Sequence, residues 1–164
     1  EGSAPAVDID VIALDWKWLF VYPHEGVASV NRLVVPVGAP LRLRITSATV
    51  MNSFLVPDLG SQMYAMSGMT TALNLRADRP GRYAGLSANF SGDGFSDMRF
   101  EVDALASADY AAWISRTHAE GRPLDGAGYA DIARPGAANG MPAFAQADPK
   151  LFDRVVRASR EGDR

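Results

Sequence analysis

Apolar and polar residues alternate with a period of two along much of this chain between residues 7 and 103. Val7, Ile9 and Val11 are interleaved with Asp8 and Asp10. The same alternation recurs at residues 41–46, 73–76 and 98–103. Because successive side chains of a strand point to opposite faces, each run predicts a β-strand with one buried and one solvated face.

Turn-forming residues separate these runs. Glycine, proline and acidic residues gather at residues 25–26, 36–40, 57–60 and 79–81. Such residues favour tight turns because glycine and proline supply the backbone angles that turns require. Many short strands with regular turns predict a mainly β domain, a sandwich or a barrel.

The pattern becomes helical after residue 105. Apolar positions at Tyr110, Trp113, Ile114 and Thr117 follow helical spacing, with Ser107 as the expected N-cap. Gly121 and Pro123 then supply a stop signal. We expect two parts, a β domain over residues 1–105 and a helical, aromatic-rich segment over residues 106–164 that packs on it.

Within this second part we expect a loop and a second helix. Residues 125–147 are rich in glycine, alanine and proline and predict a loop. Asp148-Pro149 then opens a helix, with Pro149 at a position that suits its fixed φ. Arg154, Arg157 and Arg160 form a basic edge on this helix, which is either a solvated face or a contact with lipid headgroups or a partner subunit.

Composition excludes several function classes. The 164 residues carry 16 basic and 19 acidic side chains and no cysteine. The slightly acidic balance argues against nucleic-acid binding, which needs a basic surplus. Without cysteine, the chain has no disulfides, thiolate metal sites or cysteine nucleophiles. The longest apolar runs fall short of the roughly 18–20 residues that cross a bilayer, and since the chain begins with Glu1 and not methionine, we expect a piece of a longer protein.

The two histidines do not indicate catalysis. His24 lies in a predicted turn, and His118 lies late on the first predicted helix, where a positive charge is mildly favourable. The sequence also lacks a nucleophile elbow, a phosphate-binding loop and an HExxH motif. We therefore expect no catalytic residue in this chain.

Two apolar motifs each allow two interpretations. Met63, Met66 and Met69 recur at every third position, and such thioethers either bind Cu(I) or fill gaps in a core. Trp16 and Trp18 belong to an aromatic run that continues to Tyr22. On a strand its aromatic side chains share one face, which is either core or an interface with a partner.

Four segments of this sequence together resemble subunit II of haem–copper oxidases, and specifically the bo-type ubiquinol oxidase branch. The segments are Asp15–Pro23, Val50–Pro57, Leu59–Met69 and Arg79–Tyr83. The match extends from about Val11 to Val102, and the tail resembles the extra C-terminal segment of that branch. The resemblance implies a cupredoxin-like β-sandwich of Greek-key type.

The resemblance implies that the corresponding domain of the cytochrome c oxidase branch holds a binuclear copper centre, CuA. Its ligands are a histidine and the cluster Cys-x-Glu-x-Cys-x-x-x-His-x-x-Met. The corresponding positions in this sequence are Asn52, Ser87, Asn89, Ser91, Phe95 and Met98.

The chemistry of these replacements argues against copper. A mixed-valence copper pair needs bridging thiolates, whereas Ser87 and Ser91 carry hydroxyls that stay protonated near neutral pH. Phe95 has no lone pair, and the thioether of Met98 is a weak ligand on its own. We expect a loop without metal, in which Ser87, Asn89 and Ser91 form hydrogen bonds instead.

The resemblance implies a non-redox subunit of a respiratory ubiquinol oxidase on the periplasmic face of the bacterial inner membrane. In that complex subunit I holds haem and CuB, so we expect no cofactor in this chain, with subunit I and the other subunits as partners. The family's membrane anchor is an N-terminal hairpin, which this sequence does not contain. We expect the isolated chain to be inactive; whether the domain contributes to a quinol site is open. The alternative is a soluble copper-binding module that uses Met63, Met66 and Met69.

Overall fold

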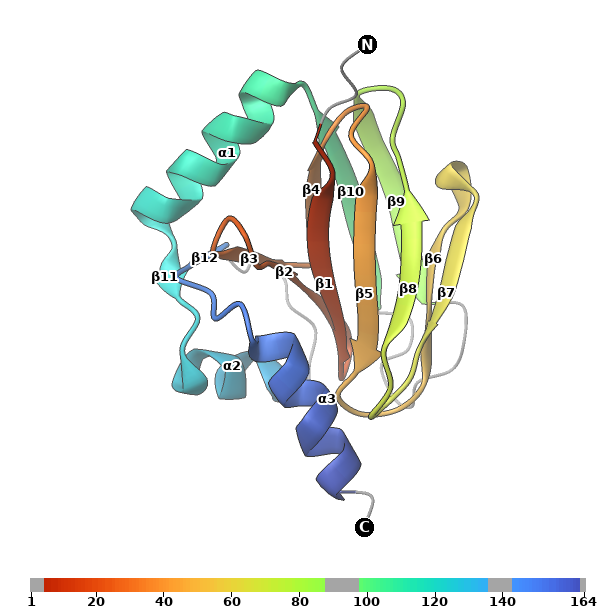
Figure 1. Ribbon diagram of the computed structural model, residues 1–164, viewed down its shortest axis with the longest axis vertical. Helices are drawn as coiled ribbons and strands as arrows, with labels where there is room; N and C mark the ends of the chain where they lie inside the picture. Colours follow the sequence, from red (N-terminus) through yellow and green to blue (C-terminus); the bar gives the residue numbers. More distant parts are fainter. Residues whose placement is uncertain (1–4, 88–97, 136–142, 163–164) are drawn as a thin grey trace.

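The computed structural model describes residues 5–87, 98–135 and 143–162 and is a sandwich of two β-sheets (Figure 1). One sheet has the strand order β11-β12-β3-β2-β1-β5-β8, and the other has the order β4-β10-β9-β6-β7. The strands are β1 (Val7–Leu14), β2 (Lys17–Tyr22), β3 (Val27–Val30), β4 (Arg32–Pro36), β5 (Leu41–Ser47), β6 (Asn52–Val56), β7 (Ser61–Ala65), β8 (Thr71–Leu75), β9 (Gly81–Ser87), β10 (Arg99–Leu105), β11 (Arg122–Pro123) and β12 (Phe144–Ala145). A short 3₁₀ turn, η1 (Pro57–Leu59), joins β6 to β7.

Aromatic rings fill the space between the sheets. The ring of Trp18 on β2 meets that of Phe54 on β6 edge-on at a centroid distance of 5.6 Å. Phe54 and Phe100 stack at 4.9 Å. Such offset and edge-on contacts add to the free energy that burial of large aromatic surfaces supplies. The alternation of residues 7–103 therefore builds a sandwich core, as predicted.

The central strands β1 and β2 are buried on both faces, whereas a solvated face was predicted for the run that forms β1. On the outer face, side chains of β1, β2 and β3 form a second core with the C-terminal tail. This second core contains Ile12, Leu14, Leu19, Val21, Ala28, Val30, Leu124, Ile132, Phe144, Ala147, Leu151, Phe152, Val155 and Val156. The tail therefore covers this outer face, which explains why β2 has the apolar residues Leu19 and Val21 there and not polar ones.

Three helices form the tail: α1 (Ser107–Glu120), α2 (Gly126–Ala133) and α3 (Leu151–Gly162). The structure confirms α1 and α3, including burial of Trp113 and of the apolar side of α3. The predicted start of the last helix at Pro149 is wrong, because α3 begins two residues later, at Leu151. Ala106 and not Ser107 precedes the first turn of α1, and no side chain caps it. None of the helices in the described part of the chain is long and apolar enough to cross a membrane.

The predicted loop over residues 125–147 is wrong in part, because it contains α2 and the short strand β12. The side chain of Asp125 accepts a hydrogen bond of 2.7 Å from the backbone N–H of Gly128 and so caps α2. Burial of Ile132 in the second core stabilises a helix that its glycines alone would not favour. Strands β11 and β12 come from the tail but belong to the same sheet as β1, β2 and β3. The predicted division into two parts at residue 105 therefore stays a prediction.

Lys17 ties α2 to the sheet. Its side chain is buried, and Nζ donates to the backbone carbonyls of Ile132 and Arg134, each at 2.7 Å. The last carbonyls of a helix lack partners within the helix and carry partial negative charge, so a cation suits this position. Burial lowers the pKa of Lys17, and the nearby carboxylates of Asp15 and Asp131 oppose that shift.

Arg44 ties α3 to the sheet. Its Nε and Nη2 donate to the buried carboxylate of Asp10 at 2.8 and 2.9 Å, and Nη1 lies 3.1 Å from Oδ1 of Asp153 on α3. The guanidinium also lies 4.5 Å from the ring centre of Phe152. Burial raises the pKa of Asp10 against the opposing effect of Arg44, whereas the hydrogen bond to Asp10 raises the pKa of Arg44.

We predict that Lys17→Met lowers the free energy of unfolding by about 1–3 kcal/mol, because two carbonyls lose a buried donor. Chemical denaturation of the whole chain measures this loss. The matched control is Lys150→Met at the chain's other lysine, which is exposed. That control should change stability by no more than about 0.5 kcal/mol. Equal effects of the two substitutions would contradict the role given to Lys17.

Candidate functional site

Three of the six predicted copper-ligand positions meet at one end of the sandwich. Asn52 begins β6, Ser87 ends β9 and Met98 directly precedes β10. Ser87 Oγ donates to Asn52 Oδ1 at 3.1 Å, and the backbone N–H of Ser87 donates to the carbonyl of Met98 at 3.1 Å. The antiparallel pairing of β9 with both β6 and β10 accounts for this meeting.

This cluster is fully enclosed by protein. Asn52, Ser87 and Met98 are at most 3% exposed. The indole Nε1 of Trp18 lies 3.4 Å from the carbonyl of Met98, and Asn52 Nδ2 donates to the carbonyl of Val50 at 3.0 Å. Hydrogen bonding of these buried polar groups offsets the cost of taking them out of water. The cluster therefore forms an uncharged polar network beside the aromatic core.

The remaining predicted positions, Asn89, Ser91 and Phe95, lie outside the described residues. Their residue types still bear on metal binding, since none of them offers a thiolate or an imidazole. Asn52 and Ser87 supply only neutral oxygen and nitrogen atoms, which suit soft Cu(I) poorly. The donor set therefore does not fit a thiolate-bridged copper pair. Elsewhere in the described residues, no three His, Cys, Asp or Glu side chains are grouped so that they could hold a metal ion.

The two tryptophans occupy different environments. Trp18 is 0% exposed and lies in the core between the sheets, so its indole presents no surface to a partner. This placement favours the core interpretation for Trp18 over the interface interpretation. Trp16 precedes β2 in a turn with a φ of 74° and packs, partly buried, against the same core. An interface at Trp16 stays a prediction.

The three methionines of the run also differ. Met63 on β7 pairs with Phe54 and packs partly buried against the core, whereas Met69 is 51% exposed. Met66 lies between them, where its carbonyl accepts the N–H of Met69 at 3.3 Å. The environment of Met63 agrees with a packing role. Copper binding by the run stays a prediction.

His24 joins a charged cluster that the sequence did not predict. Its Nε2 lies 2.8 Å from Oδ2 of Asp8, and Arg42 donates to the same carboxylate at 2.7 and 3.1 Å. The burial of Asp8 tends to raise its pKa, but hydrogen bonds from Arg42 and His24 outweigh this effect, and the pKa is lowered. Parallel pairing of β1 with β5 places Asp8 beside Arg42. These ion pairs lie at the surface, where such contacts contribute little to stability.

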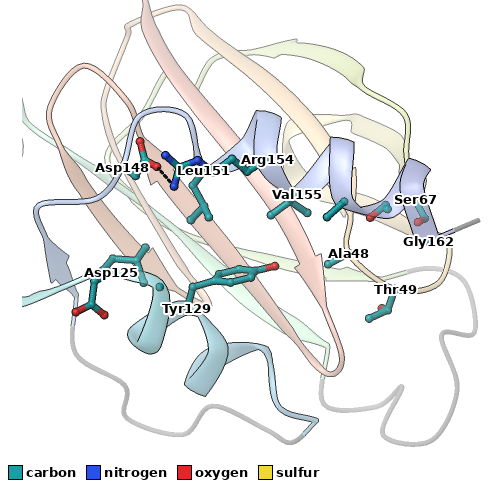
Figure 2. Close-up of a pocket in the computed structure, with 14 residues that line it drawn as sticks. Ala48, Thr49, Ser67, Asp125, Tyr129, Asp148, Leu151, Arg154, Val155 and Gly162 are labelled. Carbon is teal, nitrogen blue, oxygen red and sulfur yellow. Dashed lines mark ion pairs between the residues drawn. The ribbon is translucent and has the colours of Figure 1, made fainter.

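A pocket of about 660 Å³ lies between α2, α3 and the end of the sandwich (Figure 2). Its size lies within the range of small-molecule sites. Leu151 and Val155 line it from α3, and the ring of Tyr129 lies across it from α2. Arg154 forms an ion pair of 2.8 Å with Asp148 at one end. Leu124 adds to this apolar lining, and burial raises the pKa of Tyr129. Sequence patterns missed this pocket because α2 was predicted as a loop.

Comparison with known families identifies the scaffold. The family described as "Cytochrome C oxidase subunit II, periplasmic domain" matches residues 24–105, half of the chain. The chain belongs to this family. A solved member, the periplasmic domain of subunit II of cytochrome oxidase from Bradyrhizobium japonicum, has the same fold, with a TM-score of 0.65 at 21% identity over 67% of this chain and 91% of that one. The predicted cupredoxin-like sandwich is thereby confirmed.

Curated relatives extend the similarity over the tail. Ubiquinol oxidase subunit 2 of Acetobacter aceti is 44% identical over 99% of this chain and 52% of its own length. Cytochrome bo(3) ubiquinol oxidase subunit 2 of Pseudomonas putida is 45% identical over 95% of this chain and 50% of its own length. The chain thus spans about half the length of these relatives. The family prediction made from the four sequence segments is confirmed.

We predict that Ser87→Ala lowers the free energy of unfolding by about 1–3 kcal/mol, because the substitution removes a buried donor from Asn52. Thermal or denaturant unfolding of the chain measures this effect. The control is Ser107→Ala at an exposed serine, which should stay within about 0.5 kcal/mol of the unchanged chain. In a double-mutant cycle with Asn52→Ala, the losses should not add. Fully additive losses would show that the two side chains do not stabilise each other.

Proposed function

We propose that this chain is the extramembrane head of subunit II of a ubiquinol oxidase, with a structural and not an electron-carrying role. Its family and the names of the relatives from Acetobacter aceti and Pseudomonas putida support the quinol oxidase assignment. The observation that carries the structural role is the Asn52–Ser87 hydrogen bond, at positions where the cytochrome c oxidase branch holds CuA. The absence of cysteine from the whole sequence supports the same conclusion.

The proposed role follows from the route that the electrons take. Quinol delivers electrons from within the membrane, so the oxidase needs no relay from a soluble donor. In the proposed complex, subunit I holds haem and CuB, and the complex oxidises ubiquinol, reduces oxygen to water and pumps protons. A domain that does not transfer electrons needs only to keep its fold and its contacts with the other subunits. The aromatic core and the buried polar network serve that requirement without a metal.

The proposed location is the periplasmic face of the bacterial inner membrane. The family description, which specifies a periplasmic domain, supports this placement. Subunit I and the other oxidase subunits are the proposed partners, and the N-terminal membrane hairpin implied by the resemblance is the proposed anchor. This head would stabilise the assembled complex and assist its assembly.

We predict that the chain fails to form a binuclear copper centre when titrated with Cu(I) and Cu(II), because it offers no bridging thiolate. Visible absorption and copper stoichiometry measure the outcome. The positive control restores the full donor set with Asn52→His, Ser87→Cys, Asn89→Glu, Ser91→Cys and Phe95→His. Stoichiometric binding of two copper ions per unchanged chain, with the absorption of a mixed-valence pair, would overturn the proposal.

The same titration tests the alternative function, a copper-binding module. The half-exposed Met69 is the observation that favours it. Tight, stoichiometric Cu(I) binding that is abolished by Met63→Leu, Met66→Leu and Met69→Leu together would support that alternative. We expect weak binding that these substitutions leave unchanged.

We predict that the purified chain alone does not oxidise ubiquinol. We also predict that Met98→Leu in the whole oxidase leaves quinol turnover per assembled complex unchanged. Leucine keeps the buried volume but removes the thioether, the one family ligand that this sequence retains. Oxygen uptake normalised to haem content measures turnover. Quinol oxidation by the chain alone, or a severalfold loss of turnover per haem in the variant, would contradict a structural role.

A further inference from the structure

Helix α3 contacts the sandwich at both of its ends. Near its start, Asp153 and Phe152 engage Arg44 of β5. Near its end, Arg160 Nε donates to the carbonyl of Gly68 at 2.7 Å. Gly68 has a φ of +74°, and a Cβ at this position would lie 3.1 Å from Cγ of Arg160. The last turn of α3 therefore packs closely on the turn formed by residues 66–69, where glycine suits both the backbone angle and the close approach.

This turn is bonded to the end of β5. The carbonyl of Met66 accepts hydrogen bonds from Thr46 Oγ1 at 3.0 Å and from the backbone N–H of Ser47 at 3.4 Å. Ser47 and Ser67 also form an isolated parallel bridge. Residues 66–69 are therefore bonded directly to the start of the corner between β5 and β6, residues 47–52.

Within that corner, hydrogen bonds lead to the former ligand position. The hydroxyl of Ser47 donates to the carbonyl of Val50 and accepts the N–H of Thr49 at 3.2 Å. The carbonyl of Val50 also accepts Asn52 Nδ2 at 3.0 Å, and Asn52 accepts the hydroxyl of Ser87. Hydrogen bonds and short turns thus connect Arg160 to Ser87 without a break.

The pocket increases the importance of the Arg160 contact. Val155, Ala158, Ser159 and Gly162 line it from α3, whereas Ala48, Thr49 and Ser67 line it from the sandwich (Figure 2). Direct packing between the helix and the corner is therefore incomplete on this side. Beside the pocket, the last turn of α3 meets the sandwich directly, where Arg160 lies against Gly68 and donates to its carbonyl.

We infer that α3 is an intramolecular brace: through Arg160 and residues 66–69, it holds the β5–β6 corner so that Asn52 stays bonded to Ser87. The inference rests on the proposed function, in which no metal clamps the two segments that carry these residues. A few neutral hydrogen bonds are individually weak, and Val50 and Met51 at the corner are half exposed. The tail then supplies part of the rigidity that a bound metal supplies in the copper-containing branch.

The test is amide hydrogen exchange by NMR on the whole 164-residue chain, comparing Arg160→Ala with Arg157→Ala. Arg157 is an exposed arginine on the same helix and forms no ion pair with any residue that the structure describes. We expect Arg160→Ala to speed exchange at the amides of Ser47 and Ser87 by about tenfold, through local opening. The central amides of β1 and β2, and all amides of the Arg157→Ala control, should keep their rates.

Two exchange patterns in the Arg160→Ala variant would overturn the brace. Faster exchange confined to residues 66–69 would show that the effect stops at the turn, and equal acceleration throughout β1 and β2 would show general destabilisation. As a second measurement, Arg160→Ala in a Ser87→Ala background should add little further acceleration at residues 52 and 87, and an undiminished effect would also refute the coupling. The copper titration is independent, so failure of the brace and failure of the proposed function are distinguishable.

Discussion

Burial of β1 and β2 on both faces is the constraint on which the rest of the structure depends. One face carries Trp18 and Phe20 into the aromatic core between the sheets, and the other carries Leu19 and Val21 into the second core. An apolar outer face of this size would be unfavourable in water, so the sheet requires a cover. The tail provides it with α2, α3 and β12, which makes the C-terminal segment part of the hydrophobic structure.

Polar contacts link the cover to the sheet. The buried Lys17 donates to the carbonyl end of α2, and the partly exposed Arg44 contacts Asp153 and the ring of Phe152 on α3. Because an unpaired buried charge is strongly unfavourable, the partners of Lys17 restrict where α2 can sit. The same reasoning applies to Asn52 and Ser87, whose mutual hydrogen bond satisfies buried polar atoms at two of the predicted ligand positions.

Local patterns predicted much of this architecture but not its connections. Period-two alternation predicted the strands, and helical spacing predicted α1 and α3. The glycine-rich sequence of α2 was predicted as a loop because its stability comes from Ile132 and from Lys17, which lies more than a hundred residues away in the chain. The grouping of Asn52, Ser87 and Met98 was expected from a family resemblance and not from spacing, because Asn52 and Ser87 are 35 residues apart.

The sequence by itself determined what chemistry this protein can support. A chain without cysteine cannot build a thiolate-bridged copper pair in any conformation, because the ligand atoms do not exist. Only the tertiary structure decided what meets at the predicted ligand positions: Ser87 bonds to Asn52, and Trp18 approaches the carbonyl of Met98. It also decided that Arg160 reaches Gly68. These pairings depend on strand order and helix placement, which bring distant residues within hydrogen-bond distance, and no local pattern encodes that proximity.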